Sequence, residues 1–312
     1  MTQRSRLMKR KVQNQMRVLW AIDLIAADKK VRASAEALLK EFSKTTSLVI
    51  HPAYVVKFFE QSQSLTHGEL KKTFIANVED AMKRWLSGVK LKLENPRAIL
   101  QKGVYLRSDV DALVSEGKKV KADFILVNTH ARKGFSRFWM GSFAETLMHH
   151  SALPVLFLNP SSKPVSGIKS ILFPTNLSPD SQKALRKVGE MASRLRAELV
   201  LYYNVEYFAA TPGLALSETM VLTEIIEKDV KERKKTLDKW ANQMKKDYGI
   251  KVKAILDDTD VRVSEGIIKA SKKLPSCMIA MASQTGPILS VLVGSTTRRV
   301  VREAGVPVLA IR

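Results

Sequence analysis

The sequence predicts an α/β protein built from two similar domains, each with a five-stranded, mostly parallel sheet covered by helices on both faces. The first observation is an internal repeat, in which residues 18–24 resemble 171–177 and residues 140–158 resemble 293–311. Three pairs of matched positions, each 153 residues apart, are Asp23 and Asn176, Gly141 and Gly294, and Pro154 and Pro307. The second observation is that short, continuously apolar runs alternate with amphipathic segments in both halves, which is typical of parallel sheets buried on both faces.

In the first half, apolar runs predict five strands, at 17–24, 47–51, 97–103, 122–129 and 154–158. The segments between them predict helices at 29–44, 68–89, 108–121 and 141–150. The first helix has apolar residues at helical spacing, namely Val31, Ala35, Leu38, Leu39 and Phe42. Ser108 is suited to be the N-cap of the third helix.

The second half repeats this alternation in the same order. Strands are expected at 170–175, 198–205, 251–257, 277–283 and 307–311. Helices are expected at 180–195, 222–246, 263–273 and 294–304. We therefore divide the chain into a basic N-terminal arm at 1–16, a first domain at 17–158, a linker at 159–167 that is rich in Pro, Ser and Gly, and a second domain at 168–312.

Composition limits the possible functions. The formal net charge of +22 favours polyanionic partners such as nucleic acid, nucleotides or acidic lipid surfaces, or else serves only to solvate the surface. The first 17 residues carry six basic side chains and no acidic one, and no apolar segment follows that would make them a secretory signal. No run of 18 apolar residues predicts a membrane span, so we expect a cytoplasmic protein. Cys277, the single cysteine, lies in an apolar run and is expected to be buried and inert.

Ligands of open parallel sheets bind beyond the carboxyl ends of the strands. The first strand of the first half ends near Asp23, and the fourth ends at Asn128. After the fourth strand comes a basic loop that finishes in Gly141–Ser142, at the expected start of a helix. Free backbone N–H groups and the helix dipole favour an anion at such a corner, so we expect a pocket between these two strand ends.

The repeated strand pattern, the two Gly-Ser pairs and the Pro-Val-Leu that follows each of them resemble the universal stress protein family in a tandem, two-domain form. The resemblance covers about residues 17–158 and 168–312 and implies Rossmann-like domains of the adenine nucleotide alpha hydrolase-like fold. Nucleotide-binding members carry G-x2-G-x9-G-[ST] after the fourth strand and an Asp after the first. The first half reads Asn128-x2-Ala131-x9-Gly141-Ser142 and keeps Asp23, so the spacing and the last pair survive while both earlier glycines are replaced.

The resemblance implies that the first half binds ATP or a related adenine nucleotide, and that Mg²⁺ is bound only together with the nucleotide. The residues expected at this site are Asp23, Val127, Asn128, His130, Ala131, Arg132, Gly141, Ser142 and Phe143. Asp23 would accept hydrogen bonds from ribose hydroxyls, and Asn128 tolerates the left-handed conformation that a glycine would adopt there. The competing interpretation is a loop kept only for packing, in which Gly141 lets helix and strand approach closely.

The second half departs further from the family pattern. Its loop reads Ala282-x2-Thr285 with only eight residues before Gly294, Pro287 removes a donor, and Asn176 replaces the Asp. We expect this half to have lost the nucleotide site and to act as a pseudo-dimer partner within the chain. The resemblance implies that residues 154–158 and 307–311 pair with each other, hiding two sheet edges that would otherwise promote aggregation; a homodimer of whole chains is a further possibility.

No catalytic residue and no metal site are predicted. His149 and His150 are adjacent on a helix and point about 100° apart, and the common hydrolase, metalloprotease and P-loop motifs are absent. Three function classes remain: a stress-response or signalling module that responds to nucleotide, an interaction protein whose basic surface weakly and non-specifically binds an acidic partner, nucleic acid or membrane, and a slow ATPase.

Overall fold

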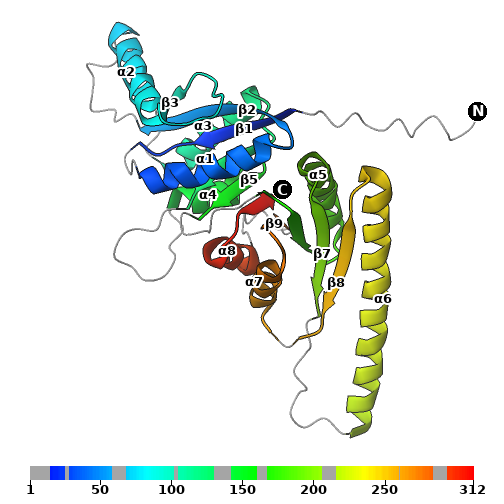
Figure 1. Cartoon of the computed structure of the whole chain (residues 1–312). Helices are drawn as coiled ribbons and strands as arrows, with labels where there is room; N and C mark the ends of the chain where they lie inside the picture. Colours follow the sequence, from blue (N-terminus) through cyan, green and yellow to red (C-terminus); the bar gives the residue numbers. More distant parts are fainter. Residues whose placement is uncertain are drawn as a thin grey trace, which may run out of the picture.

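The computed structural model describes residues 15–24, 28–57, 68–101, 105–129, 142–159, 167–205, 216–259, 261–283 and 294–312. Within these ranges, ten strands form one sheet in the order β3-β2-β1-β4-β5-β10-β9-β6-β7-β8 (Figure 1). Neighbouring strands are parallel everywhere except at β5 and β10, which pair antiparallel in the middle of the sheet. The predicted α/β fold with two tandem Rossmann-like units is therefore confirmed.

The first half contributes β1 (Gln15–Ala21), α1 (Lys29–Ser43), β2 (Ser47–Lys57), α2 (Gly68–Leu86), β3 (Arg97–Gln101), α3 (Leu106–Lys119), β4 (Phe124–Asn128), α4 (Ser142–His150) and β5 (Val155–Leu158). The second half contributes β6 (Ser170–Pro174), α5 (Pro179–Leu195), β7 (Glu198–Asn204), α6 (Leu216–Tyr248), β8 (Val252–Asp257), α7 (Val263–Lys273), β9 (Cys277–Ala282), α8 (Ser295–Glu303) and β10 (Val308–Ile311).

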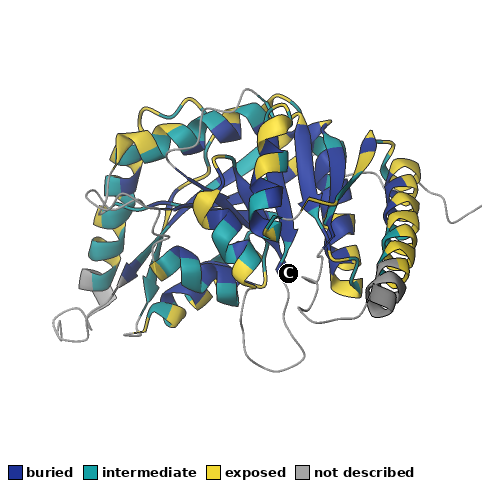
Figure 2. Ribbon diagram, turned by 90° about the horizontal axis from the view of Figure 1, so that it is seen from below, coloured by how far each residue is buried: buried dark blue, intermediate teal, exposed yellow. Residues whose placement is uncertain are grey.

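Helices cover both faces of the sheet, as predicted. One buried apolar cluster lies between the sheet and α1, α2, α5 and α6, and the other lies under α3, α4, α7 and α8. Figure 2 shows the buried strands between helices whose outer sides are exposed. Each cluster draws residues from both halves, so the chain has two continuous cores that cross the boundary between its repeats.

The predicted pairing of the two halves through residues 154–158 and 307–311 is confirmed. Leu156 lies opposite Leu309, with Val155 opposite Ala310 and Phe157 opposite Val308. The prediction of a buried Cys277 is also confirmed, since the residue is 2% exposed and burial raises the pKa of its thiol to about 12.

Several element boundaries differ from the prediction. β2 continues through Pro52 to Lys57 instead of ending at His51. The carbonyl of Ala53 accepts from the N–H of Ile22, so Ala53 faces β1 and the adjacent Pro52 faces β3, whose pairing with β2 begins only at Ala53. The missing N–H of Pro52 therefore costs the sheet no ladder hydrogen bond.

The predicted N-cap at Ser108 is wrong. α3 begins at Leu106, and Tyr105 occupies the N-cap without a side-chain hydrogen bond. α6 is longer than predicted, beginning at Leu216 rather than at 222. No helix in the described part of the chain is long and apolar enough to cross a membrane. Residues 1–14 of the predicted basic arm lie outside the described residues.

Candidate functional site

The carboxyl ends of β1 and β4 lie side by side, because these strands are parallel neighbours in the sheet. Asp23 follows β1 by two residues, Asn128 is the last residue of β4, and Ser142 opens α4. Of the other predicted site residues, His130, Ala131, Arg132 and Gly141 lie outside the described residues. The described part of the site thus consists of Asp23, Val127, Asn128, Ser142 and Phe143. These residues belong to the carboxyl ends of β1 and β4 and to the start of α4, and we call this region the edge.

Asp23 is half-buried and lies near the phenol of Tyr54 on β2. Burial is the larger influence that raises the pKa of Tyr54, and the negative charge of Asp23 raises it further. The carboxylate of Asp23 therefore lies near Tyr54 within β2 as well as near the end of β1. Tyr54 was not expected at the site, because the prediction ended β2 before it; the continuous apolar run after Pro52 is the signal that could have revealed it.

Asn128 is 5% exposed, and its Nδ2 donates to the backbone carbonyl of Val31 in the first turn of α1 at 3.4 Å. It has strand geometry and is not among the residues of positive φ, so it does not act as a left-handed substitute for glycine. Its side chain instead ties the end of β4 to the start of α1. Next to it, the N–H of Thr129 donates to the carbonyl of Leu158 at 2.9 Å, which extends the pairing of β4 with β5.

Val127 and Phe143 belong to the packing under α3 and α4. Val127 is 6% exposed, and Phe143 is partly buried against the same cluster. These side chains hold β4 and α4 together, so a ligand at the edge would reach chiefly their backbone groups. Ser142, in contrast, is exposed at the first position of α4, where helix N–H groups lack intrahelical partners.

α1 begins at the same edge. Asp28 is its N-cap, and the Asp28 side chain accepts from the N–H of Lys30 at 2.7 Å. The first turn of α1 carries no acidic residue and exposes Lys29 and Lys30. Lys29 and Lys30 thus place positive charge on the side of the edge that α1 closes, which favours an anionic ligand, whereas the Asp28 carboxylate already caps the helix N-terminus.

The second half closes the corresponding turn tightly. Asn176 uses its Oδ1 to accept from the N–H of Ser178 at 3.1 Å and from the hydroxyl of Ser181 at 2.8 Å. Ser178 caps α5 only two residues after Asn176, whereas Asp28 caps α1 five residues after Asp23. The acceptor that would meet a ribose is therefore engaged in helix capping in this half.

A polar cluster fills the neighbouring strand ends of the second half. The hydroxyl of Tyr202 donates to Asp257 Oδ2 at 2.5 Å, and Asp257 Oδ1 accepts from the Thr259 hydroxyl at 2.6 Å. The pKa of Asp257 is lowered by these hydrogen bonds even though burial, the largest influence, acts the other way. By strand register, Tyr202 and Asp257 stand where the first half has Ala53 and Ile99, so this cluster is specific to the second half.

The described residues contain no group of three or more His, Cys, Asp or Glu that could hold a metal ion. His149 and His150 end α4 with ring centroids 6.5 Å apart. Burial lowers the pKa of His150, which favours the neutral imidazole.

Comparisons with known proteins identify the family. The model of the universal stress protein family matches residues 16–159 and again residues 167–312. No curated protein matches the chain. Among solved structures, a universal stress protein from Archaeoglobus fulgidus DSM 4304 is 17% identical, with a TM-score of 0.61, and the alignment covers 96% of this chain and 98% of that one.

Two further structures have the same two-unit architecture. A functionally unknown protein from Pseudomonas aeruginosa PAO1 is 14% identical with a TM-score of 0.61, covering 96% of this chain and 93% of that one. A putative universal stress protein from Pseudomonas aeruginosa UCBPP-PA14 is 13% identical with a TM-score of 0.57, covering 96% and 94%. At these identities the likeness shows the fold alone, whereas the family model matches nearly the whole chain. The chain therefore belongs to the universal stress protein family and carries two of its domains in tandem.

Proposed function

We propose that this protein is a stress-response or signalling module that binds ATP or a related adenine nucleotide in its first domain, where occupancy alters shape or partner binding without turnover being its purpose. The observation that carries the proposal is the asymmetry between the two strand-end turns. The Asp23 turn has three more residues before its helix cap than the Asn176 turn, which is closed by its own hydrogen bonds.

The chemistry of the first edge supports an anionic ligand that carries a ribose. Asp23 would supply the acceptor for ribose hydroxyls, the N-terminus of α4 would supply N–H donors and a positive dipole end for phosphate, and Lys29 and Lys30 would add positive charge at the start of α1. Ser142 would offer its hydroxyl to a phosphate oxygen or to the water shell of a Mg²⁺ that arrives with the nucleotide. The second domain would act as the pseudo-dimer partner.

Calorimetric titration with ATP and Mg²⁺ tests this function. We expect a single site per chain, and we expect Asp23→Ala to weaken binding about tenfold or more, because it removes a charged hydrogen-bond acceptor. Asn176→Ala is the matched control in the second domain and should leave the affinity unchanged. Two equivalent sites, or an Asp23→Ala variant with normal affinity, would show that the proposal is wrong. Measured phosphate release would separate this module from a slow ATPase.

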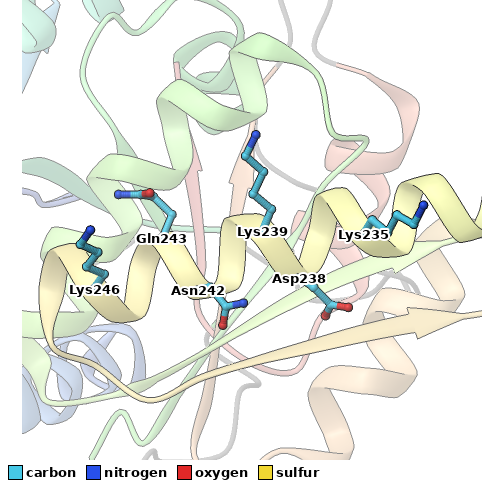
Figure 3. Close-up of a pocket in the computed structure, with 6 residues that line it drawn as sticks. All are labelled: Lys235, Asp238, Lys239, Asn242, Gln243 and Lys246. Carbon is cyan, nitrogen blue, oxygen red and sulfur yellow. The ribbon is translucent and has the colours of Figure 1, made fainter.

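A second candidate function rests on the surface of α6. Lys228, Lys231, Lys235, Lys239 and Lys246 are all exposed and follow one line along the helix, over about 27 Å at 1.5 Å per residue. We call these five residues the lysine row. Figure 3 shows its C-terminal part, where Lys235, Lys239 and Lys246 stand with Asp238, Asn242 and Gln243 around a shallow hollow.

The lysine row is better suited to bind a polyanion than to insert into a membrane surface. Its side chains carry positive charge, but no apolar residue accompanies them at the hollow. The apolar residues of α6 that are buried, Leu237, Trp240, Ala241 and Met244, face the sheet instead. An interfacial helix needs a free apolar face, whereas binding to nucleic acid backbones needs only cations.

The test is a salt titration of DNA binding by the whole chain and by a variant with Lys228, Lys231, Lys239 and Lys246 changed to Gln. Counterion release gives a slope of about −0.9 per phosphate contact, so the variant should show a shallower slope by several contacts. Deleting residues 1–15 shows whether the arm contributes. Equal slopes in all three proteins would assign the DNA binding to another surface. Binding to anionic vesicles, measured in parallel, shows whether the same proteins also bind lipid.

A further inference from the structure

A pseudo-twofold axis passes through the middle of the ten-stranded sheet. Leu156 lies opposite Leu309 in the antiparallel pairing of β5 with β10, and these residues are 153 positions apart, the spacing of the repeat. Equivalent residues that meet each other mark the axis of a twofold arrangement. The strands and helices on either side are therefore related as two subunits of a symmetric dimer would be.

The charged pair at this axis joins Glu145 on α4 with Arg298 on α8. These two residues are also 153 positions apart, and Arg298 Nε lies 3.5 Å from Glu145 Oε1. In a true twofold dimer, a residue at this place would face its own copy. Two first domains would bring Glu145 against Glu145, and two second domains would bring Arg298 against Arg298.

The setting of Arg298 makes its partner important. Its Nε is shielded from solvent and has no aligned hydrogen bond, so the nearby carboxylate is what compensates its charge. The side chains of Arg298 and Glu145 are 33% and 42% exposed, which leaves them partly screened. A second cation placed there would be unfavourable, because like charges at this distance repel without a solvent shell between them.

A second ion pair, which lies away from the axis, also joins the two domains. Arg194 near the end of α5 donates to Asp123 Oδ1 at 2.8 Å, and Asp123 Oδ2 accepts from the N–H of Arg17 at 2.7 Å. The Arg194 side chain is 13% exposed, so this pair is the better buried of the two. It connects the second domain directly to the amino end of β4 in the first.

The first-domain counterpart of Arg194 is acidic. The buried residues Ala35, Leu38, Leu39 and Phe42 of α1 correspond, at the repeat spacing, to Val188, Met191, Ala192 and Leu195 of α5. The same spacing places Glu41 where the second domain has Arg194. Two first domains paired in this way would bring Asp123 close to Glu41 of the other copy.

We propose that the ion pairs Glu145–Arg298 and Asp123–Arg194 select the partner at the boundary between the two domains, which we call the seam. They make the first domain accept the second domain and reject a second copy of itself. The tandem arrangement makes this possible, since the two halves can carry opposite charges at equivalent positions, which a homodimer of identical domains cannot do. The selection concerns the seam alone and does not depend on nucleotide binding.

The first test is a double-mutant cycle in the full chain, with Glu145→Arg, Arg298→Glu and both together. Each single reversal creates a like-charge pair at the axis and should raise the unfolding equilibrium constant about fivefold at low ionic strength. The double variant should recover most of this loss, and the coupling should shrink as salt is added. Additive effects of the two changes, or coupling that is independent of salt, would overturn the proposal.

The second test asks whether the charges choose a partner. Glu145→Arg and Arg298→Glu chains are unfolded together, refolded as an equal mixture and examined by native mass spectrometry. A reciprocal dimer, in which each first domain pairs with the second domain of the other chain, restores opposite charges at both seams. We expect several-fold more of this heterodimer than in a refolded mixture of two isotope-labelled wild-type chains.

A matched control uses a charged pair within one domain. Arg299 binds Glu303 at 3.0 Å on the same helix, so exchange between chains cannot repair Arg299→Glu with Glu303→Arg. That mixture should give no more heterodimer than wild type. If the seam mixture gives no excess either, or if the control mixture gives as much as the seam mixture, the charges at the axis do not select the partner and the proposal fails.

Discussion

At the scale of single residues, His51 on β2 couples the fold to pH. Its Nε2 is shielded and has no hydrogen-bond partner among the described residues. Burial is the main cause that lowers its pKa below 6.5, with Arg17 and Arg97 acting in the same direction and Glu94 and Glu116 opposing it. The folded state thus favours the neutral ring, whereas the unfolded chain binds a proton near pH 6.5.

The sign of the resulting pH dependence follows from linkage. Because the folded pKa lies below the unfolded one, the stabilisation is fully present above about pH 6.5 and is lost as pH falls from there toward the folded pKa. We expect the urea midpoint of wild type to fall between pH 7.5 and 5.5 by more than that of His51→Gln. Parallel decreases in the two proteins would assign the effect to other groups.

The residues of the candidate site show what a sequence pattern can and cannot predict. The motif spacing placed Asp23 and Asn128 at the carboxyl ends of β1 and β4, which are parallel neighbours in the sheet, and Ser142 at the start of a helix, where α4 begins. It could not predict that Asn128 turns inward to the carbonyl of Val31, because side-chain direction at a strand end depends on the helix packed against it. Tyr54 was not predicted at the site for a different reason. Proline is typical of a strand end, so the predicted strand stopped before Pro52.

At the scale of elements, α7 packs on β7 so closely at Gly266 that a side chain there would clash. A Cβ built on Gly266 would lie 2.3 Å from the Tyr202 hydroxyl and 3.3 Å from Asp257 Oδ2. The hydroxyl cannot easily retreat, because it is hydrogen-bonded to Asp257. Any larger side chain would therefore push α7 away from the sheet.

We expect Gly266→Ala to destabilise the protein by about 1–3 kcal/mol through overpacking, measured by urea unfolding. Gly305→Ala is the control, since nothing lies within 4 Å of its Cβ position, and it should change stability by less than about 0.5 kcal/mol. Equal effects of the two substitutions would mean that α7 can shift freely at this point.

α6 differs along its length in a way that makes a second prediction at this scale. Among residues 224–248, whose burial the structure describes, the buried ones lie from Leu237 onward, whereas none of residues 224–236 is buried and Ile225 is 58% exposed. Figure 1 shows the helix running past the ends of β7 and β8. Amides at 224–236 should therefore exchange hydrogen faster than those at 237–247, as mass spectrometry of peptic fragments can measure. Uniform protection along α6 would require that a partner cover its first half.

The elements were predicted in the right order, but the boundaries of α6, β2 and α3 were not. Pro212 and Gly213 lie a few residues before the start of α6 and favour a loop there, so the prediction began the helix too late, at 222. α3 begins at Leu106 without a side-chain cap, so no capping residue marks its start. Periodicity thus identifies that an element is present and not the residue at which it begins or ends.

At the scale of the whole molecule, the two halves share their cores. Both apolar clusters contain residues from each half, and the sheet continues across the seam through the pairing of β5 with β10. Arg194 and Asp123 add a partly buried ion pair across the same boundary. Separation of the halves would expose apolar surface on both faces of the sheet, so neither half should unfold independently.

We therefore expect a single calorimetric transition whose van't Hoff enthalpy equals its calorimetric enthalpy, although the chain contains two domains. Leu309→Asp places a carboxylate at a position that is 1% exposed and opposite Leu156, where it cannot be hydrated. This change should destabilise the pairing of β5 with β10 more than it destabilises either domain, and should divide the single thermal transition into two. Ile225→Asp, on the exposed part of α6, is the control and should leave one transition. Two resolved transitions in the wild-type protein would show that the shared cores do not couple the domains, and that the seam holds them together only as a docked pair.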